Sequence, residues 1–214
     1  MPKRRSRSKD ARFASAEEIK TRFAEQHTSL YWIAFVITAD RELAEASIVD
    51  AGGLAETNNH VFHEWLNHWA HTATARVATE KVQGQIRSAA EHYEYSEYSG
   101  RGRDGLPDDQ IKSLQAIDPC ELHQDLDALA RAILIFRGCQ HASTHECALL
   151  LKVPLRSVLG AYHRALQWYD KVLAAQAEAQ PTISTTNSFL FGLSRIDLDP
   201  LFRRKDQIDV VPSK

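Results

Sequence analysis

Several features are scarce or missing in this chain of 214 residues, and each scarcity argues against a class of protein. Three cysteines, an odd number, do not make a disulfide framework and favour a reducing cytosol. No apolar run approaches the roughly 20 residues that a membrane-spanning helix needs. The basic start of the chain is not followed by the apolar segment of a secretory signal. We therefore expect a cytoplasmic protein without membrane insertion.

Sequence signatures of catalysis are also missing. No Gly-rich phosphate loop follows a predicted strand, and neither a nucleophile elbow nor a His-Glu-x-x-His motif is present. The carboxylates show no spacing that singles out an acid–base pair. We expect no enzymatic activity, no catalytic residue and no cofactor.

Cysteine and histidine could in principle form a zinc site, because thiols and imidazoles are the ligands that zinc prefers. The nearest set is Cys139, His141, His145 and Cys147. However, His145 and Cys147 are two residues apart at the start of a predicted helix and point about 200° apart. Cys120 is separated from this set by a predicted helix about 27 Å long. We expect no metal site, and we expect Cys147 to be a small core residue.

Apolar residues recur at helical spacing, and no alternating β pattern of any length is present. This predicts an all-α fold. In the region 59–93, for example, the apolar stripe includes Phe62, Trp65, Leu66 and Trp69. Gly52-Gly53 should break or bend the helix before it. The expected helices cover 17–39, 40–51, 59–93, 118–138, 143–151 and 155–173.

These helices predict two small helical domains joined by a flexible linker. Residues 1–12 hold six Lys/Arg and one Asp, which indicates a basic disordered tail. The C-terminal extension carries apolar residues that should dock on the protein itself or on a partner. The expected order is a tail at 1–16, an N-terminal domain at 17–95, a linker at 96–117, a second domain at 118–176 and an extension at 177–214.

The second domain contains the pattern of a helix-turn-helix. Ser143 and Glu146 form a capping box that starts a short helix. Pro154 cannot continue that helix and ends a tight turn. A long helix then begins near Leu155. This unit is typical of proteins that place its second helix in the DNA major groove.

The polar side of that second helix is the candidate DNA-binding surface. Arginine and lysine pair with phosphate, and arginine, serine and glutamine also bond base edges. The alternative is a merely solvated helix face. Residues 121–180 have no net charge, which counts against strong autonomous DNA binding. The residues on this side are Arg156, Ser157, Gly160, His163, Arg164, Gln167 and Lys171.

Taken in order, these motifs resemble a small sigma factor of bacterial RNA polymerase, of the extracytoplasmic-function type with regions 2 and 4 only. The region 4 match runs through Ala148, Leu150-Leu151, Val153-Pro154, Val158 and His163-Arg164-Ala165-Leu166. The region 2 match comprises Leu30-Tyr31, Ala34, Thr38, the run from Asp40 to Glu45, Asp50, Trp65, Leu66, Ala70 and Ala75.

The resemblance implies a sigma-factor-like transcription regulator that directs RNA polymerase to promoters. Its implied partners are core RNA polymerase and promoter DNA, with an anti-sigma protein as a further candidate. By the same resemblance, Glu42, Glu45 and Asp50 would face the polymerase. Arg156, Ser157, His163 and Arg164 would face the upstream promoter element, beside Gln167 and Lys171.

The chain departs from the family pattern at positions that matter for DNA. His68, His71 and Thr72 stand where arginines near the promoter are expected, and Leu159 and Ala161 replace a lysine and an arginine of the recognition helix. A second hypothesis therefore stays open. It is a helical interaction protein that keeps the sigma fold and binds polymerase or another protein without promoter recognition.

Overall fold

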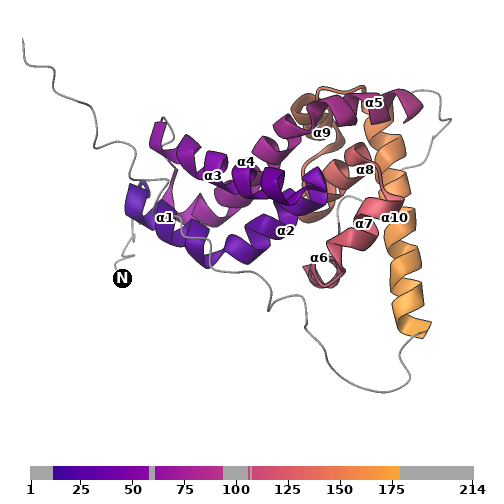
Figure 1. Cartoon of the computed structure of the whole chain (residues 1–214), viewed down its shortest axis with the longest axis horizontal. Helices are drawn as coiled ribbons and strands as arrows, with labels where there is room; N and C mark the ends of the chain where they lie inside the picture. The colour runs from indigo at the N-terminus through magenta and orange to yellow at the C-terminus, as the bar shows by residue number, and fades with distance from the viewer. Residues whose placement is uncertain (1–11, 58–60, 94–105, 107, 179–214) are drawn as a thin grey trace, which may run out of the picture.

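The computed structural model describes residues 12–57, 61–93, 106 and 108–178, and within these ranges the regular structure is helical apart from one isolated antiparallel bridge between Phe13 and Phe62. The predicted all-α class is confirmed. The elements (Figure 1) are α1 (Ala16–Glu25), α2 (His27–Thr38), α3 (Arg41–Thr57), the 3-10 turn η1 (His63–Trp65), α4 (Leu66–Lys81), α5 (Gln83–Tyr93), α6 (Asp108–Gln115), α7 (Pro119–Asp125), α8 (Ala128–Ile133), the π-helix η2 (Leu134–Cys139), α9 (Thr144–Leu151) and α10 (Leu155–Glu178).

Helix α2 is the central element of the molecule. Every residue from Leu30 to Thr38 is buried. A helix that is apolar all round must be covered on all sides, and α2 packs against α3 and α4 on one hand and α7 and α8 on the other. Helix α2 therefore packs against helices from both the N-terminal and the C-terminal parts of the chain.

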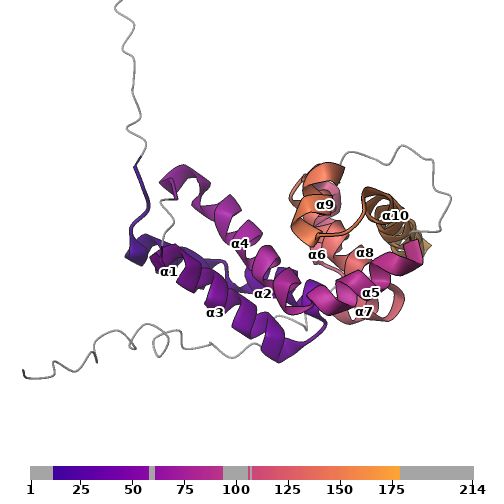
Figure 2. The same ribbon diagram turned by 90° about the horizontal axis from the view of Figure 1, so that it is seen from above.

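Seen from above, α1–α4 form one group and α5–α10 a second (Figure 2). Helix α5 follows α4 after a break at Val82, and it packs on α8 and α10 rather than on α1–α3. The buried apolar residues of both groups form one continuous cluster. The last helix of the predicted N-terminal domain thus lies against the predicted C-terminal domain.

Two side chains of the second group bond the C-terminal carbonyls of α2. The Arg131 guanidinium donates to Val36 O at 2.8 Å and to Ile37 O at 3.4 Å, and it is only 5% exposed. The His123 Nε2 lies 2.9 Å from Phe35 O. A cationic donor such as the Arg131 guanidinium is favourable at a helix C-terminus, where carbonyls lack helical partners. These bonds fix the two groups of helices to one another.

Some predicted helix boundaries are wrong. The helix expected over 17–39 breaks at Gln26, and the one expected over 118–138 is divided into α7, α8 and the π-helix. Conversely, α3 continues through Gly52-Gly53. Gly52 is buried, and a Cβ there would lie 3.8 Å from the Phe23 ring. Packing against α1 therefore outweighs the low helix propensity of glycine.

The predicted apolar stripe of residues 59–93 also needs correction at its start. Helix α4 begins only at Leu66, and the three residues before it form a tighter 3-10 turn. Phe62 and Trp65 are consequently off the buried face of α4, and Trp65 is 67% exposed. They form an aromatic patch with Phe13, whose ring stacks on Phe62 at 4.7 Å.

Part of the predicted linker is ordered helix. Leu106 is buried and its N–H donates to Gly138 O, while α6 buries Leu114. Residues 94–105 and 107, which include most of the first half of the predicted linker, lie outside the described residues, as do most of the basic tail (1–11) and the extension from 179 onward. None of the described helices combines the length and the apolar character needed to cross a membrane.

Candidate nucleic-acid interface

The short helix, the turn and the long helix that the sequence predicts are present as α9, residues 152–154 and α10. Ser143 Oγ accepts from the Glu146 N–H, and the Glu146 carboxylate accepts from the Ser143 N–H at 2.7 Å, so the capping box is confirmed. These bonds lower the pKa of the Glu146 carboxyl. Helix α9 ends at Lys152, which adopts the left-handed conformation (φ 54°), and α10 begins after Pro154.

The turn is held by a compact apolar contact. Cys147, Leu151 and Val153 are buried on the α9 side, and Val158 and Tyr162 are buried on α10. Burial raises the pKa of the Cys147 thiol to about 11, because an apolar site disfavours the thiolate. Cys147 is a core residue, as predicted, and α9 and α10 pack against each other at this turn.

Four of the predicted DNA-binding residues follow each other along one side of α10. Arg156, Gln167 and Lys171 are exposed, and His163 is half-buried with its Nε2 2.8 Å from Gln167 Nε2. Their spacings of seven, four and four residues keep them on one side of a helix. We call Arg156, His163, Gln167 and Lys171 the exposed ridge. The acidic side chain of Asp170 is exposed beside it.

Arg164 lies at the edge of this ridge. Its guanidinium is exposed and donates to Asp125 O at 3.1 Å, so it is tied to the end of α7. It also lines an open cleft between α5, α8 and α10. Arg164 can reach solvent, but its bond to Asp125 draws it away from the exposed ridge.

Ser157 and Gly160 do not lie on an exposed face, in contrast to the prediction. Ser157 is fully buried, and its hydroxyl donates to Ala90 O of α5 at 3.0 Å. A Cβ at Gly160 would lie 3.0 Å from the Tyr93 ring. Helix α5 covers this flank of α10, so the Ser157 hydroxyl is unavailable to DNA in this arrangement.

Helix α5 is hydrogen-bonded at both of its ends to other helices of the second group. At its start, Gln83 Nε2 donates to Leu151 O at the end of α9, at 2.7 Å. At its end, the Tyr93 hydroxyl donates to the Asp127 carboxylate. Burial and this bond raise the pKa of Tyr93. Ile86 and Ala90 lie between these two hydrogen bonds along α5, and both are buried.

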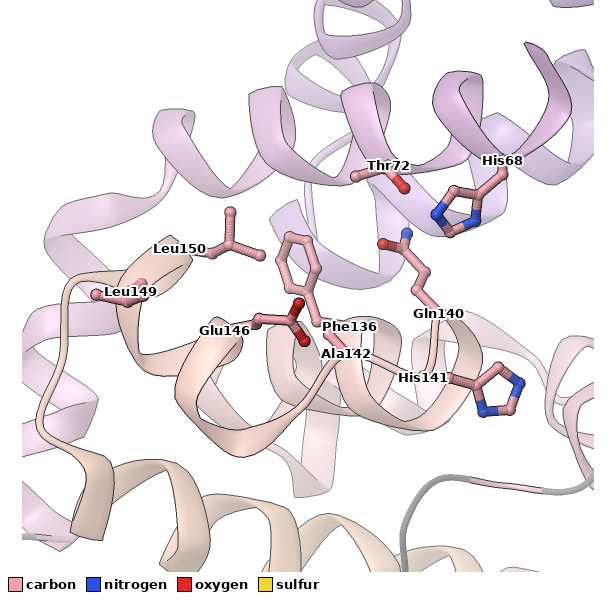
Figure 3. A pocket seen from close by; sticks show the side chains of 9 residues that line it. All are labelled: His68, Thr72, Phe136, Gln140, His141, Ala142, Glu146, Leu149 and Leu150. Carbon is pink, nitrogen blue, oxygen red and sulfur yellow. The ribbon is translucent and has the colours of Figure 1, made fainter. Parts of the chain in front are cut away.

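A second contact between the two groups of helices lies between α4 and α9. Here a cavity of about 390 Å³ opens between the groups (Figure 3). His68 and Thr72 reach it from α4, and Gln140 lies between them and the π-helix. Glu146, Leu149 and Leu150 reach it from α9, and Leu149 is 78% exposed. We call this contact the α4–α9 seam.

Polar groups in the α4–α9 seam are incompletely satisfied. Gln140 Nε2 donates to His71 O, but His71 Nε2 and Thr72 Oγ1 are buried without a hydrogen-bond partner. Burial, and then the neighbouring His68, lower the pKa of His71. His68 and Thr72, two of the three residues that stand where the sigma-factor pattern has promoter-facing arginines, therefore face α9 across this cavity.

The acidic residues expected to face polymerase do not all share one surface. Glu42 and Glu45 are exposed and one turn apart on α3. Asp50 is exposed too, but it accepts from Lys81 Nζ of α4 at 2.7 Å. Glu42 and Glu45 form an acidic pair, whereas Asp50 is turned toward α4.

The candidate zinc ligands are not brought together. Cys147 is buried in the turn, whereas His141 and His145 are exposed. Among the residues that the structure describes, no three His, Cys, Asp or Glu side chains are placed to hold a metal ion.

Sequence reasoning missed the residues that cover α10, namely Ala90 and Tyr93, because they lie far away in the sequence. One local signal was present. An isolated glycine within a strong helical pattern commonly marks a close approach of another element, and Gly160 is such a glycine. The aromatic patch had no comparable signal.

Comparisons with protein families, with characterised proteins and with solved structures give no match for this chain.

Proposed function

We propose that the protein is a sigma-factor-like, DNA-binding transcription regulator that directs RNA polymerase to promoters. One observation carries the proposal. The capped helix α9, the turn at Lys152 to Pro154 and the long helix α10 form a helix-turn-helix whose second helix presents the exposed ridge to solvent.

The exposed ridge carries residues for two kinds of DNA contact, one to base edges and one to phosphates. Arg156 lies in the first turn of α10, the part of a recognition helix that approaches base edges. Lys171 lies fifteen residues further on, or about 22 Å along the axis, where it suits a phosphate. So few cations give weak binding on their own. The proposal is therefore that DNA is bound together with polymerase.

The acidic pair on α3 supports a second contact. Glu42 and Glu45 are exposed on the same side of the helix. By the resemblance, this helix docks on the polymerase large subunit. Under this proposal the protein acts in the cytoplasm, with core polymerase and promoter DNA as partners and an anti-sigma protein as a further candidate.

A second function is favoured by a specific observation. Ser157 and Gly160 lie beneath α5, which closes one flank of the recognition helix. A protein that binds polymerase or another protein without reading a promoter would not need that flank of α10 to be accessible to DNA. The second candidate is therefore a helical interaction protein that keeps the sigma fold.

Affinity capture of core RNA polymerase followed by run-off transcription separates the two functions. Capture with transcription supports the first, and capture without transcription supports the second. The double variant Glu42→Lys/Glu45→Lys should lose capture if the acidic pair docks. The matched control, Glu17→Lys/Glu91→Lys, makes the same charge change at exposed positions of α1 and α5. Absence of capture by the unmodified protein would contradict both functions.

A further inference from the structure

We propose that α5 is a built-in cover of the recognition helix, and that DNA binding by α10 requires α5 to leave its place. The inference rests on the proposed DNA-binding function and adds the regulation of that same surface. It starts from the contacts of Ala90 and Tyr93 with the first two turns of α10.

The arrangement blocks DNA by size. The major groove is about 12 Å wide and admits one α-helix, and a helix with its side chains is itself about 10–12 Å across. Helix α5 lies directly against α10 at Ser157 and Gly160, within the part of a recognition helix that enters the groove. Two adjacent helices do not fit into the groove together.

The surface of α5 is complementary to this part of α10. Gly160 has no side chain, and the Tyr93 ring occupies the space that a Cβ would need. The Ser157 hydroxyl, which would otherwise face DNA, donates to Ala90 O. Ser157 and Gly160, the residues of α10 that contact α5, thus both belong to the side of α10 that the sequence predicts to bind DNA.

The connection to α4 permits movement. The helix breaks at Val82, whose N–H donates to Thr79 O in a tight turn. Gly84 follows in the first turn of α5, with no atom within 4 Å of the place of its missing Cβ. Helix α5 can therefore turn about this break as a rod while α4 stays packed on α2 and α3.

The α4–α9 seam favours movement of α4, the helix that leads into α5, away from α9. Thr72 Oγ1, which belongs to a residue lining this cavity, lacks a partner in the closed arrangement and would gain water when the seam opens. Because α5 continues from α4, a partner that binds α1–α4 can also shift α5. The closed arrangement is thus the state that a partner such as polymerase would have to open.

A reversible disulfide tests the cover. A Cβ at position 160 lies 3.5 Å from Tyr93 Cβ, which is within the range of a disulfide. The variant Tyr93→Cys/Gly160→Cys, with Cys120→Ser to remove the exposed thiol, is locked when oxidised and released when reduced. Its affinity for fluorescent duplex DNA of random sequence is measured by anisotropy at low salt. We expect the reduced form to bind at least about tenfold more tightly, as when a minor open state becomes dominant.

A second variant leaves α10 unchanged. Tyr93→Ala should also bind more tightly than the unmodified protein, while Gln85→Ala, at an exposed position of α5, should bind as the unmodified protein does. Equal affinity of the oxidised and reduced forms, with Tyr93→Ala unchanged, would overturn the cover and leave the DNA-binding function standing. Absence of binding by every form, including the released ones, would overturn both.

Discussion

At the scale of single residues, two residues decide how distant parts of the chain pack together. Arg131 is a buried cation whose partners are backbone carbonyls. Gly160 admits the Tyr93 ring because it has no side chain. Neither role was predictable, since Val36 and Ile37, which Arg131 bonds, and Tyr93, which Gly160 contacts, lie more than sixty residues away along the chain. The sequence nevertheless marked Gly160 as unusual within an amphipathic helix.

Arg131→Met tests the first role. The change leaves the carbonyls of Val36, Ile37 and Leu126 without their donor, and we expect the free energy of unfolding to fall by about 2–4 kcal/mol in urea titrations. Arg76→Met removes the same charge from an exposed pair with Glu80, and it should cost less than about 0.5 kcal/mol. Equal losses in the two variants would show that charge, rather than the buried bonds, is responsible.

Gly160→Ala tests the second role through a double-mutant cycle. Alanine favours a helix by up to about 1 kcal/mol over glycine, but its Cβ would meet the Tyr93 ring. We expect the substitution to destabilise the unmodified protein and to stabilise the Tyr93→Ala variant, measured as free energies of unfolding. Gly84→Ala, where the Cβ meets nothing, is the control. The same sign in both backgrounds would contradict the close contact.

At the scale of elements, periodicity and caps predicted where helices lie but not where they break. The capping box at Ser143 and the turn at Pro154 were correct because both signals are local. The breaks at Gln26 and Val82 were missed. A helix that bends to follow a core depends on distant packing, which overrides local propensity.

Ser143→Ala tests the cap that starts α9. The substitution removes the acceptor for the Glu146 N–H, and an N-cap lost to alanine costs about 1 kcal/mol. We expect this loss in the free energy of unfolding. Ser88→Ala, at an exposed position inside α5, should be neutral or slightly stabilising. A similar loss in both variants would show that α9 does not depend on its cap.

At the scale of the whole molecule, the helices of the two predicted domains share one core. The run from Leu30 to Ile37 contains no charged residue and is buried throughout, but the sequence did not predict which elements cover it. The same holds for the candidate site. Sequence spacing placed Arg156, Gln167 and Lys171 correctly on an exposed side, but the cover over Ser157 arises from the contact between the two groups of helices.

Buried imidazoles make the free energy of unfolding depend on pH. Burial lowers the pKa of His27, His71 and His123, so the unfolded chain binds protons more readily than the folded one. The free energy of unfolding should therefore fall as the pH drops from about 7 to about 5. His71→Gln/His123→Gln should flatten this dependence. His145→Gln, at an exposed position, should not, and an equal slope in all three proteins would contradict burial of these imidazoles.

The most direct test of the account is the salt dependence of DNA binding by Tyr93→Ala, in which α5 is released. Its affinity for duplex DNA should fall steeply with added salt, because phosphate contacts release counterions. Adding Arg156→Ala and Lys171→Ala should reduce the slope of log affinity against log salt by about 2. An unchanged slope, or no binding at low salt, would contradict the claim that the exposed ridge of α10 contacts DNA.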